Sequence, residues 1–215
     1  MIELKYKNWE EISLGKFNEI ESVVKSDLSD IDRVSYLLTV LTETDLQTIE
    51  GLTMVEYGRL ANEMSFIYDM PKVEIKEEYI INGKEYYLST DFRNFTAGQY
   101  IDFQTLYKDL ENNKHKLLAV FLIPKGHKYC DDYNVDNVAE EIEQHLSIVD
   151  ATACMLFFSL LYKGLTIATL TYSIKMMKKE MRKEKNNELK MKMKKAIQKT
   201  EESLHLLKST VGSLW

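Results

Sequence analysis

The sequence predicts a mainly α-helical protein, with two diverged helical repeats joined by a β-hairpin and followed by a long C-terminal helix. Three observations predict this: the chain aligns with itself at a shift of 83 residues, Asn-Gly separates two β-rich runs, and a Lys- and Met-rich segment without proline closes the chain. The expected segments are a first repeat over residues 1–70, a hairpin connector over 71–90, a second repeat over 91–165 and a helical arm over 166–215.

The repeat begins at Ser13 in the first copy and at Thr96 in the second. Residues 13–27 and 96–110 agree in hydroxyl, glycine, aromatic, acidic and apolar positions. Ser13 and Thr96 are candidate N-caps, because a side-chain oxygen there accepts a hydrogen bond from a free amide of the first helical turn. Gln99 can return such a bond and close a capping box, whereas the first copy has a lysine at that position.

The last helix of each copy aligns at a larger shift. Residues 52–57 match residues 146–151 at an offset of 94, so the second copy carries about eleven extra residues. We place this insertion in the loop from His127 to Asp136. The two copies then extend over about residues 13–68 and 96–162.

The helices of both copies carry apolar residues at helical spacing, which is typical of a face that packs in a core. We therefore expect these stripes to be buried. The residues concerned are Phe17, Ile20, Val23 and Val24; Val34, Leu37, Leu38 and Leu41; Val55, Leu60 and Met64; Tyr100, Phe103, Leu106 and Tyr107; and Phe157, Phe158, Leu160 and Leu161.

Between the copies the period of apolar residues changes to two. Residues 73–81 and 84–89 are β-rich runs around Asn82-Gly83, the dipeptide that type I′ turns favour because both central residues need positive φ. This turn places Tyr79 opposite Tyr86. A two-stranded hairpin is marginally stable alone, so its apolar face needs helices of this chain or another protein. The hairpin residues that we expect to contact a partner are Tyr79, Tyr86 and Tyr87.

The C-terminal arm contains no proline from Thr166 to Trp215, which predicts a long helix or a helical pair. Its apolar residues recur at a broken spacing of about 3.5, so the body, a partner helix or copies of the arm must cover a narrow seam. Methionine side chains adapt to irregular surfaces. The arm residues that we expect to contact a partner are Met181, Met191 and Met193.

Charge is unevenly distributed along the chain. Between Lys175 and Lys199, eleven basic and three acidic side chains give a net charge of +8, which leaves −14 for the rest. Such an arm can contact an acidic protein, the acidic part of a neighbouring copy, or nucleic acid without sequence specificity. It can also be a solvated helix face. We expect a homo-oligomer, because a duplication and complementary charges both suit self-assembly.

Composition favours an ordered protein of a reducing compartment. Hydrophobic residues make up 45% and charged residues 29%, with only 8 Gly and 2 Pro. Cys130 and Cys154 lack CxxC spacing, so we expect free thiols. The N-terminal residues contain no apolar signal-peptide region. Lys163 and Gly164 interrupt the apolar stretch from Ala151 to Met177, so we expect no membrane span.

Motifs that carry chemistry do not occur in the sequence. Neither GxGxxG nor GxxxxGK(S/T) is present, and the four histidines lie outside HExxH and zinc-ligand spacings. The acidic loop Cys130–Asp136 lacks the glycine and terminal glutamate of an EF-hand. We therefore expect no cofactor, no metal and no enzymatic activity. The alternative is an enzyme with dispersed catalytic residues.

Two runs of the first copy, Asp32–Thr42 and Leu52–Tyr57, form a pattern of helix, threonine, short helix and Leu-(Thr/Ser/Pro)-x-x-(Glu/Asp)-(Tyr/Phe). The second copy carries Gly98–Phe103 and Leu118–Lys128. These runs resemble the tail-assembly-chaperone-like proteins of tailed bacteriophages. The resemblance covers about residues 13–165 and leaves the arm outside.

The resemblance implies a non-enzymatic protein that binds other phage proteins, such as the tape-measure protein, while the tail is built in the host cytoplasm. A permanent virion component of the neck, tail or capsid interior is the alternative in the same setting. A packaging protein that contacts nucleic acid through the basic arm is a third hypothesis.

Overall fold

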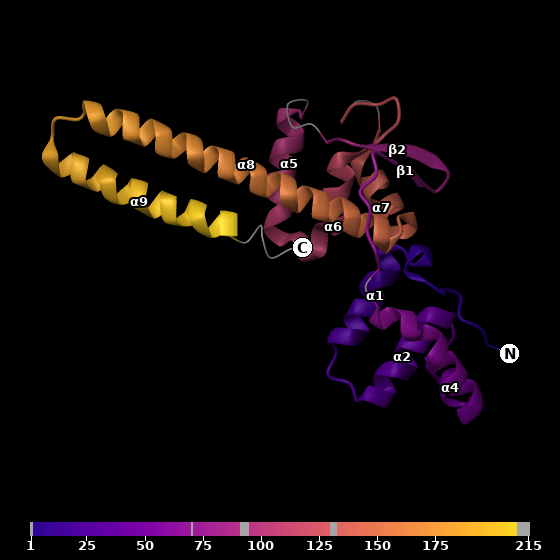
Figure 1. Cartoon of the computed structure of the whole chain (residues 1–215). Coiled ribbons are helices and arrows are strands. Elements are labelled where there is room, and N and C mark those ends of the chain that lie inside the picture. The colour runs from indigo at the N-terminus through magenta and orange to yellow at the C-terminus, as the bar shows by residue number, and fades with distance from the viewer. Residues whose placement is uncertain (1, 70, 91–94, 130–132, 210–215) are drawn as a thin grey trace. The chain divides into compact units, whose positions relative to one another are not determined.

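A computed structural model describes residues 2–69, 71–90, 95–129 and 133–209 of the chain (Figure 1). The protein is mainly helical, with a small three-stranded antiparallel sheet and a long C-terminal helix, which confirms the predicted fold class. The chain forms two compact units, Met1–Met155 and Leu156–Trp215, which we call unit 1 and unit 2. Both repeats and the hairpin lie mainly in unit 1.

Short polar residues start the helices of the first repeat. Their side chains each accept a hydrogen bond from the backbone amide three residues further on, which satisfies one of the free donors of the helix; these caps are Ser13, Ser29, Asp45 and Thr53. The elements are η1 (Trp9–Glu11), α1 (Leu14–Lys25), α2 (Asp30–Thr42), α3 (Leu46–Glu50), α4 (Met54–Glu63) and η2 (Met64–Tyr68).

The second repeat has the same order of helices and a side-chain cap at each α-helix start except that of α6. Thr96 and Gln99 form the predicted capping box, and the Ser147 hydroxyl accepts a hydrogen bond from the amide of Asp150 at 3.1 Å, as Thr53 caps the equivalent helix. The elements are α5 (Ala97–Leu106), η4 (Tyr107–Asp109), α6 (Leu110–Phe121), α7 (Val135–His145) and the beginning of α8 (Ile148–Lys183).

The sheet contains the predicted hairpin and one strand that the sequence pattern missed. Strands β1 (Glu78–Ile81) and β2 (Lys84–Leu88) pair in the expected register, with Tyr79 opposite Tyr86. Both turn residues have positive φ, as a type I′ turn requires. Strand β3 (Leu122–Pro124) pairs with β2 and covers one edge of the hairpin. Three residues are too few to show an alternating pattern.

The two repeats meet through their helix starts. The amide of Leu14 donates to the carbonyl of Leu146 at 2.9 Å, and the amide of Ile148 donates to the carbonyl of Ile12 at 2.8 Å. Next to this bridge α1 packs against α7, and a Cβ added at Gly15 would lie 3.0 Å from the carbonyl oxygen of Glu143. Glycine is therefore required for this close approach.

Burial agrees with only part of the predicted core. The buried members are Ile20, Leu37, Leu38, Leu41, Leu60, Met64, Phe103 and Phe158. Val24, Val55, Tyr100 and Tyr107 are exposed, so their predicted burial is wrong. Residues at the margin of an apolar stripe lie outside the contact that the helix makes with its neighbours. The other predicted members are half-buried, except that the Leu161 side chain lies outside the described part.

Unit 2 is an antiparallel pair of helices formed by the rest of α8 and α9 (Asn187–Ser209). Asn186 starts α9, because its side chain accepts hydrogen bonds from the next free amides. Ile174 and Ile197 are buried in the seam, and Lys178 pairs with Glu201 across it at 2.7 Å. Figure 1 shows α9 running back along α8.

Candidate interaction surfaces

None of the three hairpin tyrosines that we expected to contact a partner is fully exposed. Tyr79 and Tyr86 are buried, and Tyr87 is half-buried. Their rings pack within unit 1 because β3 and the helices of the second repeat cover the hairpin. We therefore correct the prediction: Tyr79 and Tyr86 hold the hairpin in place and are not available at the surface.

A carboxylate on α7 fastens the hairpin. Glu141 accepts hydrogen bonds from the Tyr86 hydroxyl at 2.5 Å, from Asn82 at 3.1 Å and from the Lys84 ammonium at 3.1 Å. Burial alone would raise the pKa of Glu141, but these three donors together lower it. Burial, and then the bond to Glu141, raise the pKa of Tyr86. Glu141 is thus held ionised, which suits anchoring rather than proton uptake.

An open polar cavity of about 470 Å³ lies beside this carboxylate. Amide side chains of Asn82, Asn137 and Gln144 line it together with Glu141 and His145. Tyr86, Asn82 and Lys84 all donate hydrogen bonds to Glu141. The cavity therefore presents hydrogen-bonding groups that can contact a polar surface.

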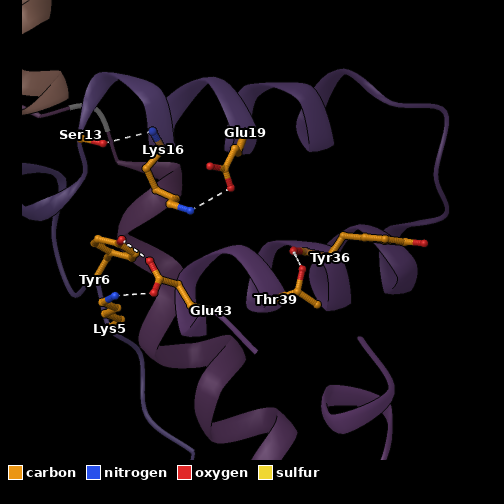
Figure 2. Close-up of polar contacts among 8 residues, drawn as sticks. All are labelled: Lys5, Tyr6, Ser13, Lys16, Glu19, Tyr36, Thr39 and Glu43. Atoms are coloured by element: carbon orange, nitrogen blue, oxygen red, sulfur yellow. Dashed lines mark hydrogen bonds and ion pairs between the residues drawn. The ribbon is translucent and has the colours of Figure 1, made fainter. Parts of the chain in front are cut away.

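A second polar cluster ties the N-terminal segment to the end of α2 (Figure 2). The Tyr6 hydroxyl donates to Glu43 at 2.7 Å, Lys5 pairs with the same carboxylate, and Lys16 pairs with Glu19 at 2.9 Å. The bonds from Lys5 and then Tyr6 lower the pKa of Glu43. Burial, and then the bond to Glu43, raise the pKa of Tyr6 to about 12. This cluster fixes the N-terminal segment on the first repeat.

The three predicted methionines of the arm are only partly on the surface. Met181 and Met193 are half-buried, whereas Met191 is 59% exposed. On α8, Tyr172 and Met176 are also exposed, and the sequence reasoning did not single out Tyr172. Their spacing of four residues is a signal that could have identified a second apolar face of this helix.

Unit 1 exposes an apolar patch that the sequence reasoning also missed. Ile31, Met54 and Val55 are 75%, 82% and 84% exposed. The first turns of α2 and α4 lie together here, since the Tyr57 hydroxyl donates to the Ile31 carbonyl at 3.3 Å and lies 3.0 Å from the Ser35 hydroxyl. Leu60 and Met64 lie on the buried side of α4, and Met54 and Val55 do not share their helical spacing. That difference in spacing could have indicated that Met54 and Val55 are exposed.

The two units carry opposite net charge. Unit 1 has 15 Lys and Arg against 29 Asp and Glu, a net charge of −14, and unit 2 has 13 against 5, a net charge of +8. The charge asymmetry predicted along the chain therefore coincides with the division into compact units.

Chemically reactive groups do not gather in the described part of the chain. Among the described residues, no group of three His, Cys, Asp or Glu side chains could hold a metal ion. Cys154 is a free thiol, and burial raises its pKa to about 12, so it stays protonated. Cys130 and the adjacent acidic residues 131–132 lie outside the described residues.

Within the described residues, one helix, α8, is long and apolar enough to cross a membrane by length and composition. Only 19% of its most apolar stretch is buried. The core helix of a soluble protein passes the same test, so the expectation of no membrane span stays a prediction.

Comparisons with known proteins found no relative: no family model, no curated protein and no solved structure matches the chain.

Proposed function

We propose that this protein is a non-enzymatic assembly protein that binds other proteins of a tailed phage, most like a tail assembly chaperone. The observation that supports it is the exposure of large apolar side chains on both units, set among opposite charges. Apolar patches with charged rims are typical of surfaces that bind proteins. The proposed location is the host cytoplasm during assembly.

Unit 2 supports a binding role most directly. Of the hydrophobic side chains that the structure describes in this unit, Phe158, Ile174 and Ile197 are buried. Two helices with so small a shared core gain little stability from each other, because helices in proteins are stabilised mainly by packing an apolar face. An apolar helix of another protein, such as a segment of the tape-measure protein, would complete this packing.

Co-expression with the tape-measure protein encoded in the same genome tests the proposal. We expect the soluble fraction of the tape-measure protein to rise in the presence of this chain and to fall back with Tyr172→Asp. The matched control is Thr152→Asp, another exposed position of α8. A tape-measure protein whose solubility ignores the chain would contradict the proposal.

A permanent virion component remains the second candidate, because the exposed faces suit a stable contact as well as a transient one. Mass spectrometry of purified particles separates the two: a chaperone leaves before the particle is complete, whereas a structural protein is present at fixed stoichiometry. The net charge of +8 on unit 2 also permits nonspecific contact with nucleic acid. A salt-sensitive mobility shift of duplex DNA would show that contact.

A further inference from the structure

One side of α8 presents apolar and cationic groups together. Tyr172, Lys175, Met176 and Lys179 follow a spacing of three, one and three residues, which places them on the same side of a helix. Tyr172 is 64% exposed and Met176 is 37% exposed. Lys178, which points to the seam, pairs with Glu201, but no described carboxylate pairs with Lys175 or Lys179. We call these four residues the basic face.

The patch on the first repeat has the complementary character. Ile31, Met54 and Val55 are surrounded in sequence by acidic residues of the same first helical turns, Asp30 and Glu56. The Asp30 side chain is almost fully exposed, and one of its oxygens pairs with Arg33 of the same turn at 3.0 Å. We call these five residues the acidic face. Both faces combine large apolar groups with charge, and their charges are opposite.

Net charge decides which contacts between copies are favourable. Two copies that met through unit 2 would bring together net charges of +8 and +8, and two that met through unit 1 would bring together −14 and −14. Contacts between like charges cost free energy, whereas opposite potentials steer and stabilise an encounter. The favourable contact therefore joins unit 2 of one copy to unit 1 of another.

We propose that copies of this protein associate head to tail, with the basic face of one copy on the acidic face of the next. Because the two faces differ, each added copy leaves one face of each kind open, so the contact generates a ring or a chain of copies rather than a closed dimer. The inference concerns the purified protein alone and does not rest on the proposed phage partner.

Light scattering of the full chain over a range of concentrations tests the contact. We expect a mass above that of a dimer at low salt, which falls as the NaCl concentration rises from about 0.05 M to about 0.5 M because exposed charges are screened. Two double variants isolate the faces: Met176→Glu with Lys179→Glu, and Ile31→Lys with Val55→Lys. All four positions are exposed, so the fold should tolerate the changes, and circular dichroism checks the helix content.

Each variant alone should associate at least about tenfold more weakly than the unmodified protein, because it loses one face. Mixed in equal amounts, the two variants should form a one-to-one heterodimer, since each keeps the face that the other lacks. The control is Lys195→Glu, which makes the same charge change as Lys179→Glu at an exposed position of α9, outside the basic face. It should change the affinity between copies by no more than about twofold.

Three results would overturn the proposal. The unmodified protein could stay monomeric at low salt and high concentration. The variants could remain monomeric when mixed. Or the Ile31→Lys with Val55→Lys variant could associate normally while the other does not, which would show a symmetric contact through unit 2.

Discussion

The two repeats share their helix order and most of their caps but differ in the connection after the second helix. In the first repeat, residues 43–45 join α2 to α3; in the second, residues 122–134 join α6 to α7 and contain β3. The hairpin between the repeats is held by the second one, through β3, Glu141 and the bond from Tyr87 to the His127 carbonyl. The second repeat thus has a sheet partner, β3, at positions that align with the last turns of α2 in the first repeat.

We expect the largest difference in stability effect between the repeats at the third residue of their first helices, Gln99 in α5 and Lys16 in α1. Gln99 is buried, closes the capping box of α5 and donates to the Val120 carbonyl at 3.0 Å. Gln99→Ala leaves that buried carbonyl unpaired and should lower the free energy of unfolding by about 3 kcal/mol. Lys16→Ala, the aligned change, removes only a partly exposed ion pair and should cost at most about 0.5 kcal/mol. Urea denaturation measures both; equal losses would mean that the repeats are alike here.

Replacing the aligned glycines of the two copies by alanine should change the stability of the protein in opposite directions. Gly15→Ala places a Cβ 3.0 Å from the Glu143 carbonyl oxygen and should destabilise the protein by about 2 kcal/mol. Gly98→Ala meets nothing closer than the Thr96 hydroxyl at 3.7 Å and should stabilise it by up to about 1 kcal/mol, because alanine favours helix. Thermal unfolding of the pair checks this. A neutral Gly15→Ala would refute a close contact between α1 and α7.

The two hairpin hydroxyls should differ more modestly. Tyr86→Phe removes a 2.5 Å bond to a carboxylate, which should lower the free energy of unfolding by about 1.5 kcal/mol. Tyr87→Phe removes a 3.2 Å bond to a backbone carbonyl and should cost about 0.5 kcal/mol. Denaturation curves of both variants measure the difference, and a costlier Tyr87→Phe would show that α7 is not the main anchor of the hairpin.

The smallest effects concern acid stability. The pKa values of Glu141 and Glu43 are lower in the folded state than in the unfolded chain, so each carboxylate contributes stability above its unfolded pKa that is lost as pH falls through the folded pKa. Glu141→Gln should therefore reduce the loss of stability between about pH 5 and pH 3. Glu43→Gln should reduce it less, because Glu43 is more exposed to solvent. Unfolding at a series of pH values gives the comparison.

Sequence reasoning succeeded where local chemistry decides the structure. The caps at Ser13 and Thr96 and the turn at Asn82-Gly83 depend on residues within one turn of one another, and all three are present as predicted. It failed where burial depends on distant neighbours. The apolar stripe of α5 gave no indication that Tyr100 would face outward, and the hairpin tyrosines gave none that β3 and Glu141 would enclose them.

By itself, the sequence determined the mainly helical class, the hairpin register and the separation of charge, because spacing, capping and charge are properties of neighbouring residues. Only the tertiary structure decided that Tyr79 and Tyr86 are buried, that β3 joins the sheet, and that Ile31, Met54 and Tyr172 are exposed. The physical reason is that an apolar side chain is buried only where another element covers it, and that element can come from any part of the chain.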